Sequence, residues 1–133
     1  MRLLNFILII FLILTNGIKA DTEFQVLKNL KNGGNLIFIR HAYAPGGGDP
    51  DNFDINDCST QRNLNEEGRK QAKNIGNFFK KNLIPIDKVI SSEWCRCKET
   101  AKIAFKKFET KNFLNSFFSK KFSKNRTNQI KDL

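Results

Sequence analysis

The sequence is poor in several residues that common protein sites require. It contains one histidine, His41, and three cysteines, Cys58, Cys95 and Cys97, among 133 residues. Structural zinc modules place their cysteine and histidine ligands in closely spaced pairs, and these four residues lack that spacing. We therefore predict a protein without a metal site and without a cofactor.

Long hydrophobic runs are also missing. The longest one, Leu3–Leu14, is apolar except for one asparagine and is shorter than the ~20 residues that span a bilayer. Arg2 before this run and the small residue Ala20 after it give the layout of a secretory signal peptide, with a membrane anchor as the alternative. We expect residues 1–20 to be a signal peptide. The mature chain, residues 21–133, is then exported without a stable membrane anchor, to the periplasm in a Gram-negative source.

Acidic residues are few. The sequence has 13 aspartates and glutamates against 23 lysines and arginines, a formal net charge of +10 at pH 7. Basic proteins can bind nucleic acids or anionic membranes by releasing counterions. The lysines are spread over the whole chain, however, and no stacking platform or reading helix stands out. We therefore predict no nucleic-acid partner.

The chain is long enough for one hydrophobic core and shows no internal repeat, which predicts one domain. Leu36–Ile39, four consecutive bulky apolar residues, predicts a strand buried on both faces of a parallel sheet. A short helix that stops at Gly33 and Gly34 precedes it and is expected to pack outside the sheet. Arg40 and His41 follow the strand at its carboxyl end, where open sheets bind ligands. A fixed cation beside an imidazole suits an anion such as phosphate.

A helix and a second strand come next. Asn65 is expected to cap a helix that opens at Glu66 and runs to about Lys81, and Asp87–Ser91 is predicted to be a short strand. A strand, a helix and a strand in this order form a βαβ unit with parallel strands. One apolar stripe should face the sheet from the helix: Gly68, Ala72, Ile75, Phe79 and Leu83.

A further helix is predicted to begin near Ser92 or Glu93, with Arg96 in its first turn. Because the two strands are parallel, Arg96 should lie at the same sheet edge as Arg40 and His41. The start of a helix also offers free N–H groups and the positive end of a dipole. These groups together predict an anion site.

The long segment 43–63 is predicted to be a loop, since it has no apolar periodicity. Irregular loops of this length beside a strand end are often functional. Its triple glycine, Gly46–Gly48, is not a P-loop because no Gly-Lys-Ser/Thr follows, so we interpret it as a lid or hinge. In an exported protein, Cys58 of this loop should bond either Cys95 or Cys97 and leave one thiol free.

Three segments occur in an order and at distances that are typical of one family. They are Ile39–Ala42, Asn63–Ala72 and Ser91–Ala101. They resemble the R-H-G or R-H-A, L-x-x-x-G with Gln-Ala, and S-S-x-x-x-R-x-x-x-T-A patterns of the histidine phosphatase superfamily, the phosphoglycerate-mutase-like fold. The resemblance covers roughly residues 35–108. It implies an α/β protein with the parallel-sheet βαβ core of a three-layer fold.

The resemblance also implies a function. The protein would be a metal-independent phosphohydrolase that acts on a phosphorylated small molecule or a phosphoprotein, with His41 as the nucleophile that is transiently phosphorylated. Arg40 and Arg96 would hold the non-bridging oxygens, and Arg62 would line the substrate pocket. Trp94 is expected to be a packing anchor.

The sequence also departs from the family. Family members use a second histidine from a later strand and continue beyond this core, whereas His41 is the only histidine here. We therefore expect residues 21–133 to be an incomplete histidine phosphatase domain, truncated at its C-terminus, and leave open an inactive product. The proton donor is unassigned among Glu93, Glu109 and Asp57.

Two alternative functions remain at this point. One is a non-catalytic module that binds phosphate or a phosphoprotein, in which Arg40 and Arg96 still bind the anion. The other is a basic envelope protein that binds anionic lipid. The substrate and the oligomeric state are not predicted.

Overall fold

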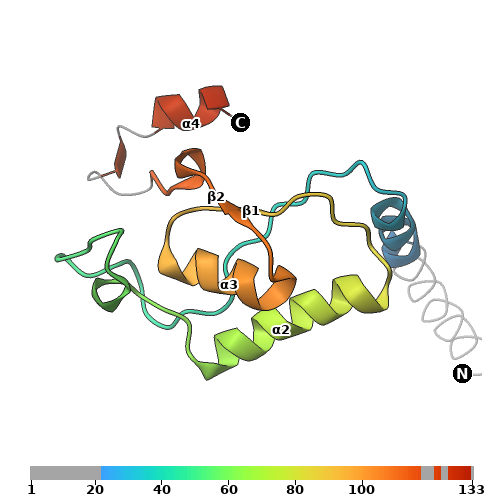
Figure 1. Cartoon of the computed structure of the whole chain (residues 1–133), viewed down its shortest axis with the longest axis horizontal. Helices are drawn as coiled ribbons and strands as arrows, with labels where there is room; N and C mark the ends of the chain where they lie inside the picture. Colours follow the sequence, from blue (N-terminus) through green and yellow to red (C-terminus); the bar gives the residue numbers. More distant parts are fainter. Residues whose placement is uncertain (1–21, 118–121, 124–125, 133) are drawn as a thin grey trace, which may run out of the picture.

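A computed structural model describes residues 22–117, 122–123 and 126–132 of the chain. The predicted signal peptide, residues 1–20, lies outside these ranges and stays a prediction. A helix at residues 22–31 comes first. It is followed by η1 (Cys58–Thr60), α2 (Glu66–Lys81), β1 (Ile90–Ser91), α3 (Cys95–Phe105), β2 (Glu109–Thr110), η2 (Asn112–Leu114) and α4 (Arg126–Asp132), where η marks a 3₁₀ helix (Figure 1). Among the described residues, no helix combines the length and the apolar character needed to cross a membrane.

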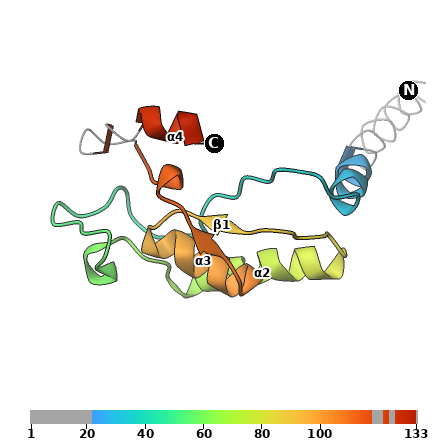
Figure 2. The same ribbon diagram turned by 45° about the horizontal axis from the view of Figure 1, so that its top comes forward.

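The sheet of the described region consists of two short parallel strands. Ile90 of β1 pairs with Glu109 of β2, and Ser91 pairs with Thr110. Helix α3 connects the two strands, so that β1, α3 and β2 form a βαβ unit, which both views show (Figures 1 and 2). The predicted fold class, α/β with a parallel βαβ core, is confirmed.

The first predicted strand is wrong. Leu36–Ile39 is extended but belongs to no strand, and Leu36 and Phe38 are 79% and 72% exposed instead of buried. A hydrophobic run becomes a strand only where another strand offers hydrogen-bond partners, and the two strands of the described region pair with each other. The observed βαβ unit therefore contains α3 and not α2.

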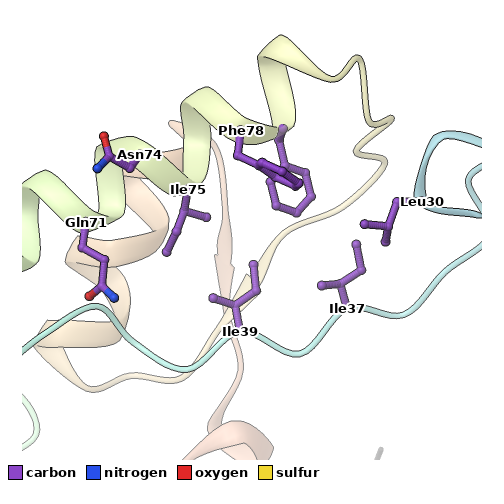
Figure 3. Close-up of a pocket in the computed structure, with 8 residues that line it drawn as sticks. Leu30, Ile37, Ile39, Gln71, Asn74, Ile75 and Phe78 are labelled. Atoms are coloured by element: carbon purple, nitrogen blue, oxygen red, sulfur yellow. The ribbon is translucent and has the colours of Figure 1, made fainter. Parts of the chain in front are cut away.

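The extended segment instead covers one side of α2. Ile37 and Ile39 point toward the helix across an apolar groove of ≈ 430 Å³ (Figure 3). The helix at residues 22–31 contributes Leu30 to this groove, while its Phe24 and Val26 are exposed. This helix lies at the far end of the molecule from α4 and does not pack on the sheet, which corrects the prediction (Figures 1 and 2).

Helix α2 has the predicted bounds. Its N-cap is Asn65, whose side-chain oxygen accepts the N–H of Gly68, and acidic residues in the first turn suit the helix dipole. Gly68 and Ala72 are buried, as the apolar stripe predicts. Leu83 does not continue the stripe, because it lies beyond the helix end at φ 54 and is 82% exposed.

Helices α2 and α3 pack closely side by side. A Cβ atom at Gly76 of α2 would lie 2.3 Å from the carbonyl oxygen of Ala104 in α3, so only glycine permits this approach. The rings of Phe79 and Phe105 meet edge to face at 5.2 Å between centroids. The two packed helices each bond to the segment that follows His41.

Candidate active site

The segment at His41 is attached to both helices by side chains. The N–H of Ala42 donates to Thr100 Oγ1 of α3 at 3.0 Å, and the N–H of Tyr43 donates to Gln71 Oε1 of α2 at 2.7 Å. Thr100 Oγ1 donates in turn to the carbonyl oxygen of Arg96 at 2.7 Å. The Gln-Ala and Thr-Ala motifs thus contain the residues that position the histidine segment.

The His41 ring is held in one tautomer. Its Nδ1 lies 2.7 Å from the carbonyl oxygen of Ala42, and a carbonyl oxygen only accepts, so Nδ1 carries the proton. Nε2 then keeps its lone pair when the ring is neutral. A histidine nucleophile needs this arrangement, because the attacking nitrogen must be unprotonated.

Burial lowers the pKa of His41 below its ordinary value of 6.5. The hydrogen bond with Ala42 raises this pKa, and the positive charges of Arg96, Arg62 and Arg40 lower it. The net direction is downward, so the ring is neutral at pH 7. The structure therefore brings all three predicted arginines into electrostatic range of His41, with Arg96 acting most strongly of the three.

Arg96 is buried and paired with an aspartate that sequence reasoning missed. Its Nη1 and Nη2 donate to Asp49 Oδ1 and Oδ2 at 2.6 and 3.1 Å. Asp49 also accepts the indole N–H of Trp94 at 3.0 Å and the backbone N–H of Arg62 at 3.1 Å. The only signal for Asp49 in the sequence was an acidic residue directly after the triple glycine.

Arg62 connects the two ends of the loop. Its Nη1 donates to the carbonyl oxygens of Ala44 at 2.6 Å and Gly46 at 3.1 Å. Gly46 has φ 88 and Gly48 has φ 74, a region that favours glycine. In the described part of the chain, the buried Nε atoms of Arg62 and Arg96 have no hydrogen-bond partner.

The loop is also fastened to α3. A disulfide joins Cys58 to Cys95, one of the two predicted pairings, and leaves Cys97 free. Gln61, which is 6% exposed, accepts the N–H of Cys95 and donates to the carbonyl oxygens of Asp54 and Ile55. The part of the loop between Asp49 and Arg62 is thus attached at several points, whereas the sequence suggested a lid or hinge.

The start of α3 differs from the prediction. The helix begins at Cys95, two or three residues later than expected, with Trp94 as N-cap. Two N–H groups expected to be free are bonded, that of Cys95 to Gln61 and that of Glu93 to Asn115 Oδ1 at 2.9 Å. Trp94 is 2% exposed and stacks on a phenylalanine, which confirms it as a packing anchor. The helix start therefore offers the predicted anion site fewer free N–H groups than expected.

Two of the three candidate proton donors are poorly suited to the task. Hydrogen bonds from Ser59 lower the pKa of Asp57, and a hydrogen bond from Lys88 together with its charge lowers the pKa of Glu109. Both shifts reduce the protonated fraction of these carboxylates, which disfavours them as proton donors. The third candidate, Glu93, accepts a hydrogen bond at Oε2 from the side chain of Asn115 at 2.6 Å.

The described ranges contain no cluster of three or more histidine, cysteine, aspartate or glutamate side chains that could hold a metal ion. The charged side chains that shift the His41 pKa are instead cationic, and they are those of Arg96, Arg62 and Arg40. This arrangement suits an anion with several oxygen atoms.

Comparison with known proteins agrees with this geometry. A stretch of 88 residues is 33% identical to the serine/threonine-protein phosphatase Pgam5, mitochondrial, of Drosophila virilis. The stretch amounts to 66% of this chain and 27% of the relative, so the chain spans about a quarter of that curated protein. No solved structure matches significantly. Residues 36–115, which include His41 and its three arginines, match the histidine phosphatase superfamily (branch 1), and the chain belongs to this superfamily.

Proposed function

We propose that the protein is a phosphatase that works through a phosphohistidine on His41. The observation that carries this proposal is the environment of the ring: Nδ1 is bonded to Ala42, Nε2 has no hydrogen-bond partner among the described residues, and the charges of three arginines act on a neutral imidazole. A neutral nucleophile beside fixed positive charge suits a dianionic phosphoryl group. The superfamily and the phosphatase relative support a phosphatase-like function.

The reaction has two steps. Nε2 of His41 attacks phosphorus in line, so that an N–P bond forms while the P–O bond to the leaving group breaks. Water then attacks the phosphorus of the phosphohistidine, which releases inorganic phosphate and restores the imidazole. Arg40, Arg62 and Arg96 stabilise the charge on the transferring oxygens in both steps.

The leaving oxygen must gain a proton unless it is already a weak base. Glu93 is the candidate donor, because it lies in the turn before α3, three residues before Arg96. Substituting Glu93 by glutamine should then slow hydrolysis of an alkyl phosphate much more than hydrolysis of p-nitrophenyl phosphate, because p-nitrophenolate leaves without protonation.

We further propose a phosphoprotein or a phosphorylated small molecule as substrate. The relative is named as a serine/threonine-protein phosphatase, which supports the phosphoprotein. We also propose export, which is supported by the N-terminal pattern and by the disulfide between Cys58 and Cys95, since disulfides persist in oxidising compartments. Finding the mature N-terminus at Asp21 in the exported fraction supports this proposal, and an intact Met1 there contradicts it.

The experiment for the main proposal is hydrolysis of p-nitrophenyl phosphate in the presence of a chelator. We expect His41→Ala to abolish the signal and Arg96→Gln to lower kcat/KM strongly. Arg69→Gln is the matched control, because Arg69 forms a surface ion pair with Glu99 at 2.7 Å and should leave the rate unchanged. A rate that survives His41→Ala contradicts the proposal.

A second candidate function is a phosphate- or phosphoprotein-binding module. The observation in its favour is that His41 is the only histidine of the sequence, so no second imidazole can assist the reaction. This candidate predicts saturable phosphate binding that requires Arg96, without release of product from any phosphate ester.

A further inference from the structure

We propose that Asp49 is a positioning residue that orients Arg96 toward the phosphoryl group. By holding the Nη1/Nη2 edge of the guanidinium, Asp49 leaves the adjacent Nε/Nη2 edge to the oxygens of the bound anion. This inference rests on the proposed function, because it assumes that the anion at His41 is a phosphoryl group. Sequence reasoning gave Asp49 no role.

The Asp49–Arg96 pair is bidentate and shielded from solvent. The two contacts measure 2.6 and 3.1 Å, and the side chains of Arg96 and Asp49 are 9% and 13% exposed. Parallel N–H···O bonds of this kind fix the plane of the guanidinium as well as its position. A buried pair with this geometry is far more restrictive than a surface ion pair.

The donors of Arg96 can be counted. A guanidinium has five N–H bonds, two on each Nη and one on Nε. Nη1 donates to Asp49 and to the carbonyl oxygen of Arg62 at 3.3 Å, and Nη2 donates to Asp49. The Nε–H and one Nη2–H remain, and they lie on the same edge. This edge has the spacing that binds two oxygens of a phosphate.

The Nε/Nη2 edge of Arg96 lacks a hydrogen-bond acceptor among the described residues. Arg96 is 8% exposed, and its buried Nε has no partner among the described residues. An unpaired buried N–H is costly, and native proteins normally satisfy such groups. Nε has less than 1 Å² of accessible surface, so a phosphoryl oxygen can accept its N–H only after the atoms that cover it move.

Asp49 is itself prevented from moving. Its carboxylate accepts hydrogen bonds from Trp94 in the turn before α3 and from the backbone of Arg62 at the end of the loop. Burial raises the pKa of Asp49, but the hydrogen bonds from Arg96, Trp94 and Arg62 outweigh this effect and the pKa is lowered. The carboxylate is therefore ionised at neutral pH. Because its own position is fixed by these hydrogen bonds, it can fix the orientation of Arg96.

The alternative interpretation is an inhibitory contact, in which Asp49 competes with the substrate for Arg96. The two interpretations predict opposite effects of Asp49→Asn. The side-chain amide of asparagine cannot accept hydrogen bonds from both Nη atoms of Arg96. If Asp49 positions Arg96, the guanidinium is then no longer oriented and the affinity for phosphate falls. If Asp49 is an inhibitory contact, the same change frees Arg96 and the affinity for phosphate rises.

The test measures the Kd of inorganic phosphate by titration calorimetry, and kcat and KM for p-nitrophenyl phosphate, on the full chain. We expect Asp49→Asn to raise the Kd ~10-fold or more and to lower kcat/KM ~10- to 100-fold, the usual effect of losing a charge-assisted pair. Asp51→Asn is the matched control, since Asp51 is an exposed acid of the same loop. An unchanged or tighter Kd in Asp49→Asn overturns the inference.

A second measurement does not require the variant to fold. In the wild-type chain, the Nε–H resonance of Arg96, assigned with Arg96→Lys, should shift when phosphate is added. No shift, or no phosphate binding at all, overturns the inference. Phosphate binding that requires Asp49, without hydrolysis that requires His41, overturns only the proposed function.

Discussion

At His41, the position of one proton decides the chemistry. The hydrogen bond from Nδ1 to Ala42 leaves Nε2 as the attacking atom, and the pKa of the ring is lowered by burial and by arginine charges. Because only the neutral ring attacks, activity should be lost as the pH falls through the His41 pKa. We expect the acid limb of kcat/KM to have its midpoint below pH 6.5, and a midpoint above 6.5 contradicts this account.

Arg96 should contribute to the position of that midpoint. Its charge is the largest of the three arginine contributions that lower the His41 pKa. Arg96→Gln removes the repulsion, so the His41 pKa should rise and the residual activity should fall off at a higher pH. An NMR titration of the ring measures the shift directly. Arg69→Gln, on the surface of α2, should leave the titration curve in place.

Gly68 is required by close packing. A Cβ atom there would lie 1.9 Å from the carbonyl oxygen of Tyr43, two residues after His41. Gly68→Ala should therefore lower the free energy of unfolding by ~1–3 kcal/mol, as overpacking does. Urea denaturation measures this change. Gly47→Ala is the control, because a Cβ atom at Gly47 meets nothing within 4 Å, and equal losses in both variants would contradict the packing argument.

At the scale of elements, the disulfide holds the loop to the start of α3. Cys58 and Cys95 are 37 residues apart in sequence, and bridges of such loops stabilise by about 2–4 kcal/mol. Cys58→Ser with Cys95→Ser should lower the free energy of unfolding by that order and raise KM, because the loop also carries Asp49 and Arg62. A KM equal to wild type contradicts the second expectation.

Cys97 should behave differently from the bridged cysteines. Burial raises the pKa of its thiol, so that little thiolate exists at pH 7.5. We expect one thiol per unreduced chain in denaturant and slow alkylation of that thiol in the native protein. Rapid alkylation, or a bridge from Cys58 to Cys97 in the peptide map, contradicts the structure.

The sequence predicted the start of a helix better than it predicted which strands pair in the sheet. Asn65 and the glutamates after it predicted the start of α2 correctly, because helix capping is a local interaction. Leu36–Ile39 has an equally clear pattern, yet whether it becomes a strand depends on a distant partner that the pattern does not contain.

The site shows the same contrast. The arginine and histidine motifs predicted His41, Arg40, Arg62 and Arg96 as site residues, and the charges of the three arginines act on the His41 ring. Asp49 escaped notice because its role depends on a contact with Arg96, 47 residues away, and on nothing in its own neighbourhood. The predicted pairing of Cys58 stayed open between Cys95 and Cys97 because both lie in the same turn of one helix.

At the scale of the whole molecule, an apolar surface remains open. Leu36 and Phe38 are exposed on the extended segment, and Ile37 and Ile39 line the groove beside α2 (Figure 3). Contiguous exposed apolar residues on unpaired extended backbone promote association. We expect Phe38→Ser to reduce self-association in light scattering without loss of folding stability. If Phe38→Ser associates as strongly as the wild type, this apolar surface is not the one that mediates self-association.

The defining step of the proposed reaction is transfer of the phosphoryl group to Nε2 of His41. The direct measurement is to quench the wild-type chain in alkali during turnover of p-nitrophenyl phosphate and to identify the phosphorylated residue by ³¹P NMR and peptide mass spectrometry. We predict an acid-labile phosphohistidine at His41, attached through Nε2. A phosphoryl group on Nδ1 or on any other residue, or turnover without a phosphorylated intermediate on His41, would contradict the account.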